Sequence, residues 1–167
     1  MTILNNVRLL LVALWLGAAI FFSAVAAPGV FHVLRAFGLS NANEIAGTIV
    51  TRALGVVNTS GFILSLLLIV TAFALRESYG RRSLILQIVL LAVVAVTTGL
   101  GEWVIAARMR GLRAAMHAPI DQVPMSDPRH VAFATLHGYS VTALGIAIIA
   151  ALIAFFVIAN RVTLDRN

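Results

Sequence analysis

The chain has no cysteine and no lysine, and only 11% of its 167 residues are charged. Without cysteine there is no disulfide, no thiolate nucleophile and no cysteine-ligated metal. Soluble domains carry about 25% charged residues, so the shortage of charge argues against a soluble protein. The twelve basic residues are all arginine and give a net charge of +6. Because no soluble module carries them as a patch, we expect them to flank membrane segments and not to bind nucleic acid.

Long apolar segments take up most of the chain, and its mean hydropathy is +1.03. Uncharged runs cover residues 9–34, 53–75, 83–101 and 131–160. Each approaches or exceeds the roughly 20 residues that a helix needs to cross about 30 Å of hydrocarbon. The sequence lacks the alternation of apolar and polar residues that is typical of the strands of a membrane β-barrel. The sequence predicts an all-α integral membrane four-helix bundle with antiparallel up-down passes, helices at about 7–37, 43–76, 82–116 and 128–160, and no soluble domain.

Two signals bear on where helices begin and bend. Arg8, the apolar run after it and the small residues 24–27 resemble a cleavable leader. The run continues past Pro28 to residue 34, which is longer than a leader needs, so we expect a first membrane helix kinked at Pro28. Asp127 followed by Pro128 is typical of an N-cap and the first helical residue of the last helix.

The ionisable residues nearest the apolar segments are expected to gather at one end of the bundle. Four passes alternate in direction, which brings His32, Arg52, Glu102 and His137 to the end opposite the termini, with Arg35 beside them. Charge near hydrocarbon is costly and persists mostly where it is used or paired. The sequence therefore predicts a functional site at this end and no ionisable residue close to the spans at the other end.

Glu102 follows a long uncharged run, and Arg52 is expected at the same end on the second helix. A Glu102–Arg52 ion pair would satisfy both charges, either as a packing contact or as part of a site that handles protons or cations. Asn58 lies about 9 Å deeper than Arg52 at 1.5 Å per residue. Its amide needs hydrogen-bond partners in lipid, and Ser140 or Thr98 is a candidate to supply one.

His32 and His137 are expected at similar depth on the first and last helices. Two histidines on different helices suit haem or a metal such as copper, or each hydrogen-bonds a neighbour. The sequence has no HExxH motif. Our leading expectation therefore includes no cofactor, and haem or copper held by His32 and His137 is the alternative.

Three stretches of the sequence resemble a known family. They are Leu14-Trp15-Leu16-Gly17 with Phe21-Phe22, Ala27-Pro28 and Phe31; Glu44-Ile45-Ala46-Gly47 leading to Arg52; and Leu136-His137-Gly138-Tyr139-Ser140. Together they resemble the bacterial domain-of-unknown-function family allied to the transmembrane protein 205-like proteins, over about residues 7–157. The resemblance implies a four-helix membrane protein and supplies no reaction or cofactor. It adds weight to Pro28, Arg52, His137 and Gly138.

We expect a non-enzymatic, multi-pass protein of the bacterial inner membrane that contacts the lipid bilayer. A polar cleft would bind or pass a small solute, a metal ion or a lipid headgroup through His32, Arg52, Asn58, Glu102, His137 and Ser140. Arginines number six at each end, and the compact basic turn 76–82 favours cytoplasmic termini. The alternatives are a haem or copper redox protein, a membrane enzyme of anthrone-oxygenase type, and a homo-oligomer or subunit of a larger complex.

The cofactor alternative has a direct test. We expect the purified protein to show no Soret band and no stoichiometric copper or iron, because His32 and His137 lie on separate helices and neither belongs to a ligand motif. Visible absorption and metal analysis of one sample measure both. A Soret band that disappears in His137→Ala would establish the haem alternative instead.

Overall fold

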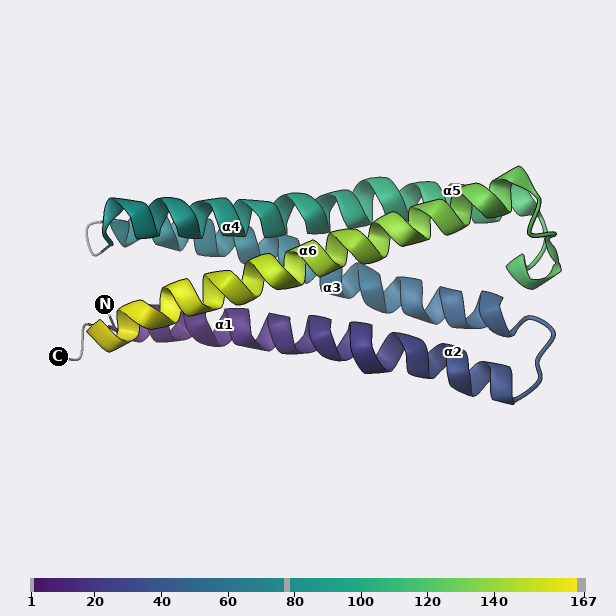
Figure 1. Cartoon of the computed structure of the whole chain (residues 1–167), viewed down its shortest axis with the longest axis horizontal. Coiled ribbons are helices and arrows are strands. Elements are labelled where there is room, and N and C mark those ends of the chain that lie inside the picture. The colour runs from purple at the N-terminus through teal and green to yellow at the C-terminus, as the bar shows by residue number, and fades with distance from the viewer. Residues whose placement is uncertain (1, 77–78, 165–167) are drawn as a thin grey trace.

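The computed structural model describes residues 2–76 and 79–164, and Figure 1 shows them as four helical rods. The first rod joins α1 (Thr2–Phe21), the wide-turned segment η1 (Phe22–Ala26) and α2 (Ala27–Ala36). The second is α3 (Ala42–Ala74), and the third joins α4 (Arg81–Gly99), η3 (Leu100–Ala106) and α5 (Ala107–Met116). The short helix η4 (Ile120–Gln122) precedes the fourth rod, α6 (Pro128–Leu164).

Each of the four rods is long and apolar enough to cross a membrane, which makes this a multi-pass membrane protein and confirms the predicted all-α bundle. The rods run up and down, so both termini lie at one end and the α2–α3 link and η4 lie at the other (Figure 1). The first rod begins at Thr2 and not near residue 7. The last helix begins at Pro128, as the Asp127-Pro128 signal indicates.

Small side chains let α6 approach its neighbours closely. Ala147 and Ala151 are buried and pack in one cluster with Trp15 of α1 and Val94 of α4. In lipid there is no hydrophobic driving force between helices, so close van der Waals contact through small residues is what holds such a bundle together. The core of the half nearer the termini is therefore narrow and tightly packed.

One indole fixes how α1 meets α3. The Nε1 of Trp15 donates to the carbonyl oxygen of Val57 at 3.0 Å. Its ring lies against Gly61, where an added Cβ would come within 2.6 Å of the indole. Real Cβ atoms do not approach a ring that closely, so the absence of a side chain at residue 61 is what permits this contact.

Two glycine substitutions are expected to change stability in opposite directions. Gly61→Ala forces the buried Trp15 ring to move and should lower the free energy of unfolding by roughly 1–3 kcal/mol. Gly17→Ala meets nothing within 4 Å. It should be neutral or stabilise by up to about 1 kcal/mol through helix propensity. Unfolding by sodium dodecyl sulfate in mixed micelles, followed by tryptophan fluorescence, measures both, and equal effects would contradict the packing described for Trp15.

A buried arginine joins three rods at the end that carries the termini. Arg8 is 1% exposed. Its guanidinium donates to the Tyr79 hydroxyl at 2.6 Å, to Gln87 Oε1 at 3.0 Å and to the Leu68 carbonyl oxygen at 3.3 Å. The Tyr79 hydroxyl also donates to Asn5 Oδ1. The guanidinium thus ties α1 to α3, to α4 and to Tyr79, two residues before α4.

This arrangement contradicts the prediction that all ionisable residues near the spans lie at the other end. The sequence pattern presents Arg8 as a flanking residue because the apolar run starts after it. The helix, however, already starts at Thr2, which places Arg8 about two turns inside it. Neutral hydrogen-bond acceptors elsewhere in the bundle then bind both terminal nitrogens of the guanidinium, while its Nε is buried without a partner in the described residues.

Replacing Arg8 should weaken the bundle more than replacing an exposed arginine of the same end. In Arg8→Leu, the buried Gln87 Oε1 loses its donor, at a cost of roughly 1–3 kcal/mol for a group left unsatisfied, whereas the Leu68 carbonyl keeps the Thr71 hydroxyl as a donor. Arg81 is exposed, so Arg81→Leu should have little effect. The same detergent unfolding measurement compares the two variants. Similar midpoints would show that the Arg8 contacts contribute no net stability.

Candidate functional site

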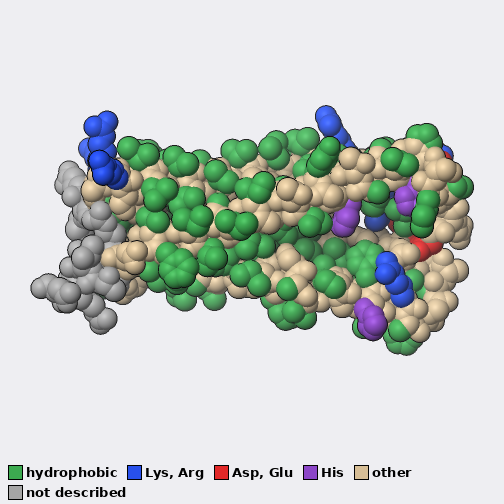
Figure 2. Space-filling view, viewed as in Figure 1, with side chains coloured by type: hydrophobic (Ala, Val, Ile, Leu, Met, Phe, Trp, Pro, Cys, Tyr) green, Lys and Arg blue, Asp and Glu red, His purple; other side chains and the backbone are tan. Residues whose placement is uncertain are grey.

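A cavity of about 380 Å³ lies between the first rod, α3 and α6. Toward the far end from the termini, α6 leaves the first rod and runs alongside α5, while α2 stays against α3 (Figure 1). The separation of α2 from α6 creates the space. Figure 2 shows this face of the bundle hollowed there, with histidine and basic side chains nearby. The cavity thus belongs to the half of the bundle in which the rods diverge.

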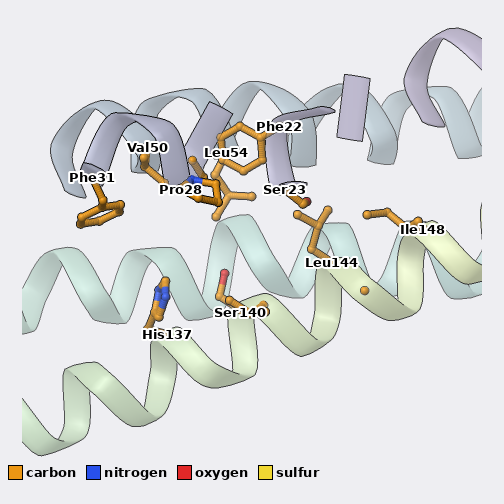
Figure 3. Close-up of a pocket in the computed structure, with 13 residues that line it drawn as sticks. Phe22, Ser23, Pro28, Phe31, Val50, Leu54, His137, Ser140, Leu144 and Ile148 are labelled. Carbon is orange, nitrogen blue, oxygen red and sulfur yellow. The ribbon is translucent and has the colours of Figure 1, made fainter. Parts of the chain in front are cut away.

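The walls of the cavity are mostly apolar. The side chains of Phe22, Pro28, Phe31, Leu54, Leu144 and Ile148 line it from the first rod, α3 and α6 (Figure 3). No arginine, aspartate or glutamate lines it. A volume of this size falls within the roughly 300–1,000 Å³ of ordinary small-molecule sites. The cavity is therefore suited to the apolar body of a ligand and unsuited to a fully charged one.

Two polar side chains on α6 face this apolar space. Figure 3 shows His137 and Ser140 directed from α6 toward the opposite wall. Ser140 is only 6% exposed, yet neither it nor His137 makes a hydrogen bond within residues 2–76 and 79–164. By contrast, Thr142 and Ser23 donate to the carbonyl oxygens four residues before them, at 3.0 and 2.8 Å. The cavity therefore offers a hydroxyl and an imidazole with unused hydrogen-bonding capacity.

The wall formed by the first rod depends on the wide turn at η1. The N–H of Ala27 donates to the carbonyl oxygen of Phe22, five residues back. Pro28 follows at once, has no N–H and would clash with the carbonyl four residues earlier in a regular helix. Widening the turn relieves that clash without ending the helix. The sequence predicts a kink at Pro28, and the structure has the π-helical segment η1 ending two residues before the proline.

Glu102 lies in the second wide-turned segment, η3, away from the cavity lining. Its carboxylate packs against Gly55 of α3, where an added Cβ would lie 3.3 Å from Oε2. The Oε1 atom accepts from Arg110 at 3.3 Å. The predicted Glu102–Arg52 pair is wrong, because the intervening wide turn brings Arg110 of the same rod within reach. Arg52 is exposed and pairs with no acid in the part of the chain that the structure describes.

Asn58 is buried beside this segment. It is 3% exposed, and its amide lies close to Gly101, where an added Cβ would be 3.0 Å from Nδ2. The partners suggested by the sequence do not bond it. Thr98 donates to the Val94 carbonyl at 2.6 Å, and Ser140 faces the cavity. Asn58 and Glu102 therefore each pack against a glycine of the facing segment where α3 meets η3.

His32 is exposed on α2 and does not line the cavity that His137 faces. Among residues 2–76 and 79–164, three or more histidine, aspartate or glutamate side chains never gather as a metal site would require. Of the six predicted site residues, the cavity thus takes in His137 and Ser140. Asn58 and Glu102 lie at the α3–η3 contact, and His32 and Arg52 lie on the surface.

Charged side chains link α3, α5 and η4 at the end of the bundle opposite the termini. Asp121 in η4 accepts from the backbone N–H groups of Asn43 and Glu44 at 3.3 and 2.9 Å, which caps the start of α3. Glu44 pairs with Arg113 of α5 at 3.4 Å and accepts from the Ile120 N–H at 3.1 Å. These contacts hold the connection between α5 and α6 against the start of α3.

Asp127 stabilises the start of α6 as predicted. Its Oδ1 accepts from the backbone N–H of Arg129 at 2.8 Å, and its Oδ2 pairs with the Arg129 guanidinium at 2.7 Å. The side-chain hydrogen bond from Arg129, followed by the backbone one, lowers the pKa of Asp127 to about 2. The cap is therefore ionised at any physiological pH.

Arg35 is a site residue that the sequence points to only weakly. Its guanidinium lies over the ring of Phe31, which lines the cavity, with 5.5 Å from Cζ to the ring centre. Its Nε donates to Asn43 Oδ1 at 2.8 Å. The spacing of one helical turn between residues 31 and 35 is the sequence signal for this contact. The sequence does not predict that α2 separates from α6, and this separation is what makes Phe31 part of the cavity wall.

Comparison with known proteins gives one match. Residues 10–118 match the model of a domain of unknown function, DUF4149. No curated protein and no solved structure matches the chain. The matched region runs from α1 through the end of α5. It includes the cavity walls formed by η1, α2 and α3 but not the wall formed by α6. Because the match covers more than half of the sequence, the chain belongs to the DUF4149 family.

Proposed function

We propose that this protein binds one amphiphilic molecule from the bilayer in the cavity between the first rod, α3 and α6. The unused Ser140 hydroxyl at 6% exposure, inside an otherwise apolar cavity, is the observation that carries the proposal. A polar group that is buried in lipid without a partner is costly. A ligand that brings a hydrogen-bond partner to Ser140 removes that cost.

The ligand would lie along the cavity with its polar part toward His137. His137 and Phe31 stand at one end in Figure 3, and Leu144 and Ile148 extend toward the other. Residues 137 to 148 span about 16 Å at 1.5 Å per residue, which suits an elongated molecule. The lack of charged lining residues favours an uncharged segment at this depth.

The proposal includes the wider biological setting. We infer a bacterial inner-membrane protein with cytoplasmic termini, allied to the transmembrane protein 205-like proteins. The exposed Arg76, Arg81 and Arg82 at the end with the termini support this orientation. Binding without chemistry is the role that the cavity supports best, since His137 and Ser140 make no hydrogen bond to each other in the described residues and no carboxylate lines the cavity to orient the imidazole. A haem or copper role receives less support, because His32 lies outside the cavity lining.

Filling the cavity should abolish ligand binding while the fold remains. Gly145 lines the cavity and an added Cβ there meets nothing within 4 Å, so Gly145→Phe extends a ring into the space without a backbone clash. Gly138 on the same helix also has open space but does not line the cavity, which makes Gly138→Phe the matched control. Native mass spectrometry after mild delipidation measures retained adducts of added palmitoyl-lysophosphatidylglycerol and hexadecanol.

We expect the wild type and Gly138→Phe to retain one bound amphiphile, and Gly145→Phe to retain it at least about tenfold less, equivalent to 1.4 kcal/mol of binding free energy. Size-exclusion profiles and unfolding midpoints show whether each variant is folded. Equal retention by the two phenylalanine variants, or no retained amphiphile in the wild type, would rule out the proposal.

A further inference from the structure

Beyond binding an amphiphile, the geometry points to its class: we propose that the cavity holds one acyl chain of a phospholipid whose phosphate is bound by Arg35. This inference rests on the proposed function, because it concerns the ligand of the same cavity. It adds a recognition element outside the cavity lining, at the end of α2.

The position of Arg35 is fixed by two contacts. The guanidinium stacks over Phe31, and its Nε is held by Asn43. Its two terminal nitrogens make no hydrogen bond in residues 2–76 and 79–164, and no carboxylate in that part of the chain pairs with it. A guanidinium offers parallel N–H groups that match the oxygens of a phosphate. Arg35 therefore presents an oriented, uncompensated cation at the mouth of the cavity.

The nearby acids are already engaged. Asp121 is bound by the Asn43 amide and the start of α3, and Glu44 is bound by Arg113. Arg113 is in turn stacked over Phe133 of α6, with 5.3 Å from Cζ to the ring centre, and donates to Thr48. Neither acid is therefore available to Arg35, and an anionic group from outside is the partner that would complement it.

The order of chemical groups along the cavity matches that of a phospholipid. Arg35 stands one turn beyond Phe31 toward the end of α2. Next along the cavity come His137 and Ser140, whose side chains are able to form hydrogen bonds with a ligand. The apolar wall that ends at Ile148 follows. A phospholipid carries a phosphate, then ester carbonyls that accept hydrogen bonds, then an acyl chain. The Ser140 hydroxyl would donate to an ester carbonyl, which a free alcohol or hydrocarbon lacks.

Arg52 provides a matched control for Arg35. It is likewise exposed and without an acid partner in the described residues, but it lies on α3 between the cavity residues Val50 and Leu54, two positions from each. Two positions along a helix turn a side chain to the far side from both. Arg52→Gln thus removes one arginine charge from the same end of the protein without touching the cavity.

The test compares retention of dioleoyl-phosphatidylglycerol, dioleoylglycerol and oleate by the wild type, Arg35→Gln, Arg52→Gln and Gly145→Phe, using native mass spectrometry. We expect Arg35→Gln to lower phosphatidylglycerol retention about tenfold and Arg52→Gln to change it less than twofold. Dioleoylglycerol, which has the same chains and no phosphate, should bind the wild type about tenfold more weakly than phosphatidylglycerol does.

The outcomes separate the two proposals. If Gly145→Phe abolishes retention but Arg35→Gln does not weaken it, or if dioleoylglycerol or oleate binds the wild type as well as phosphatidylglycerol, amphiphile binding stands and phosphate recognition is overturned. If Gly145→Phe retains phosphatidylglycerol like the wild type, the proposed function itself fails. Should Arg35→Gln not yield a monodisperse sample, the lipid comparison on the wild type alone decides whether the phosphate is recognised.

Discussion

The divergence of α6 from the first rod is the constraint on which the site depends. Near the termini, alanines of α6 pack closely on Trp15 and its neighbours, so that no space remains between the rods. Toward the other end α6 runs alongside α5, and the α5–α6 connection is fastened over α3 through Asp121 and Glu44. A helix held at both ends by different partners cannot also cover α2, and the cavity is the space that results.

Some polar side chains of the bundle have hydrogen-bond or ion-pair partners within the protein, and others do not. The terminal nitrogens of Arg8 bind a tyrosine hydroxyl, an amide and a carbonyl, while its buried Nε has no partner in the described residues. Glu102 has Arg110, and Asp127 has Arg129. Ser140 and the terminal nitrogens of Arg35 lack such partners within the described residues. In a medium that supplies no water, unfilled hydrogen-bonding groups of this kind are better indicators of a ligand than charge alone.

Much of the architecture follows from the sequence, because a membrane restricts the chain to helices of a set minimum length. The four spans, the start of α6 after Asp127 and the disturbance at Pro28 all rest on local chemistry. The hydrogen-bond and ion-pair partners of individual side chains do not follow from local chemistry. Glu102 reaches Arg110 because a wide turn lies between them, and Arg8 is buried because the helix starts before the apolar run. Which side chains face the cavity depends on tertiary packing that periodicity does not encode.

The wide turn at Phe22–Ala26 carries a consequence for the first rod as a whole. A π-type turn holds one residue more than an α-helical turn, so side chains after it are rotated by about 100° relative to a continuous α-helix. In a continuous α-helix, Phe31 would be turned by about 100° from Val12. The wide turn cancels that offset, so the stripe that buries Val12 and Trp15 continues into the stripe that bears Phe31 and Arg35. A change that restored a regular helix at Phe22–Ala26 would thus turn Phe31 and Arg35 away from the face with which α1 contacts the bundle.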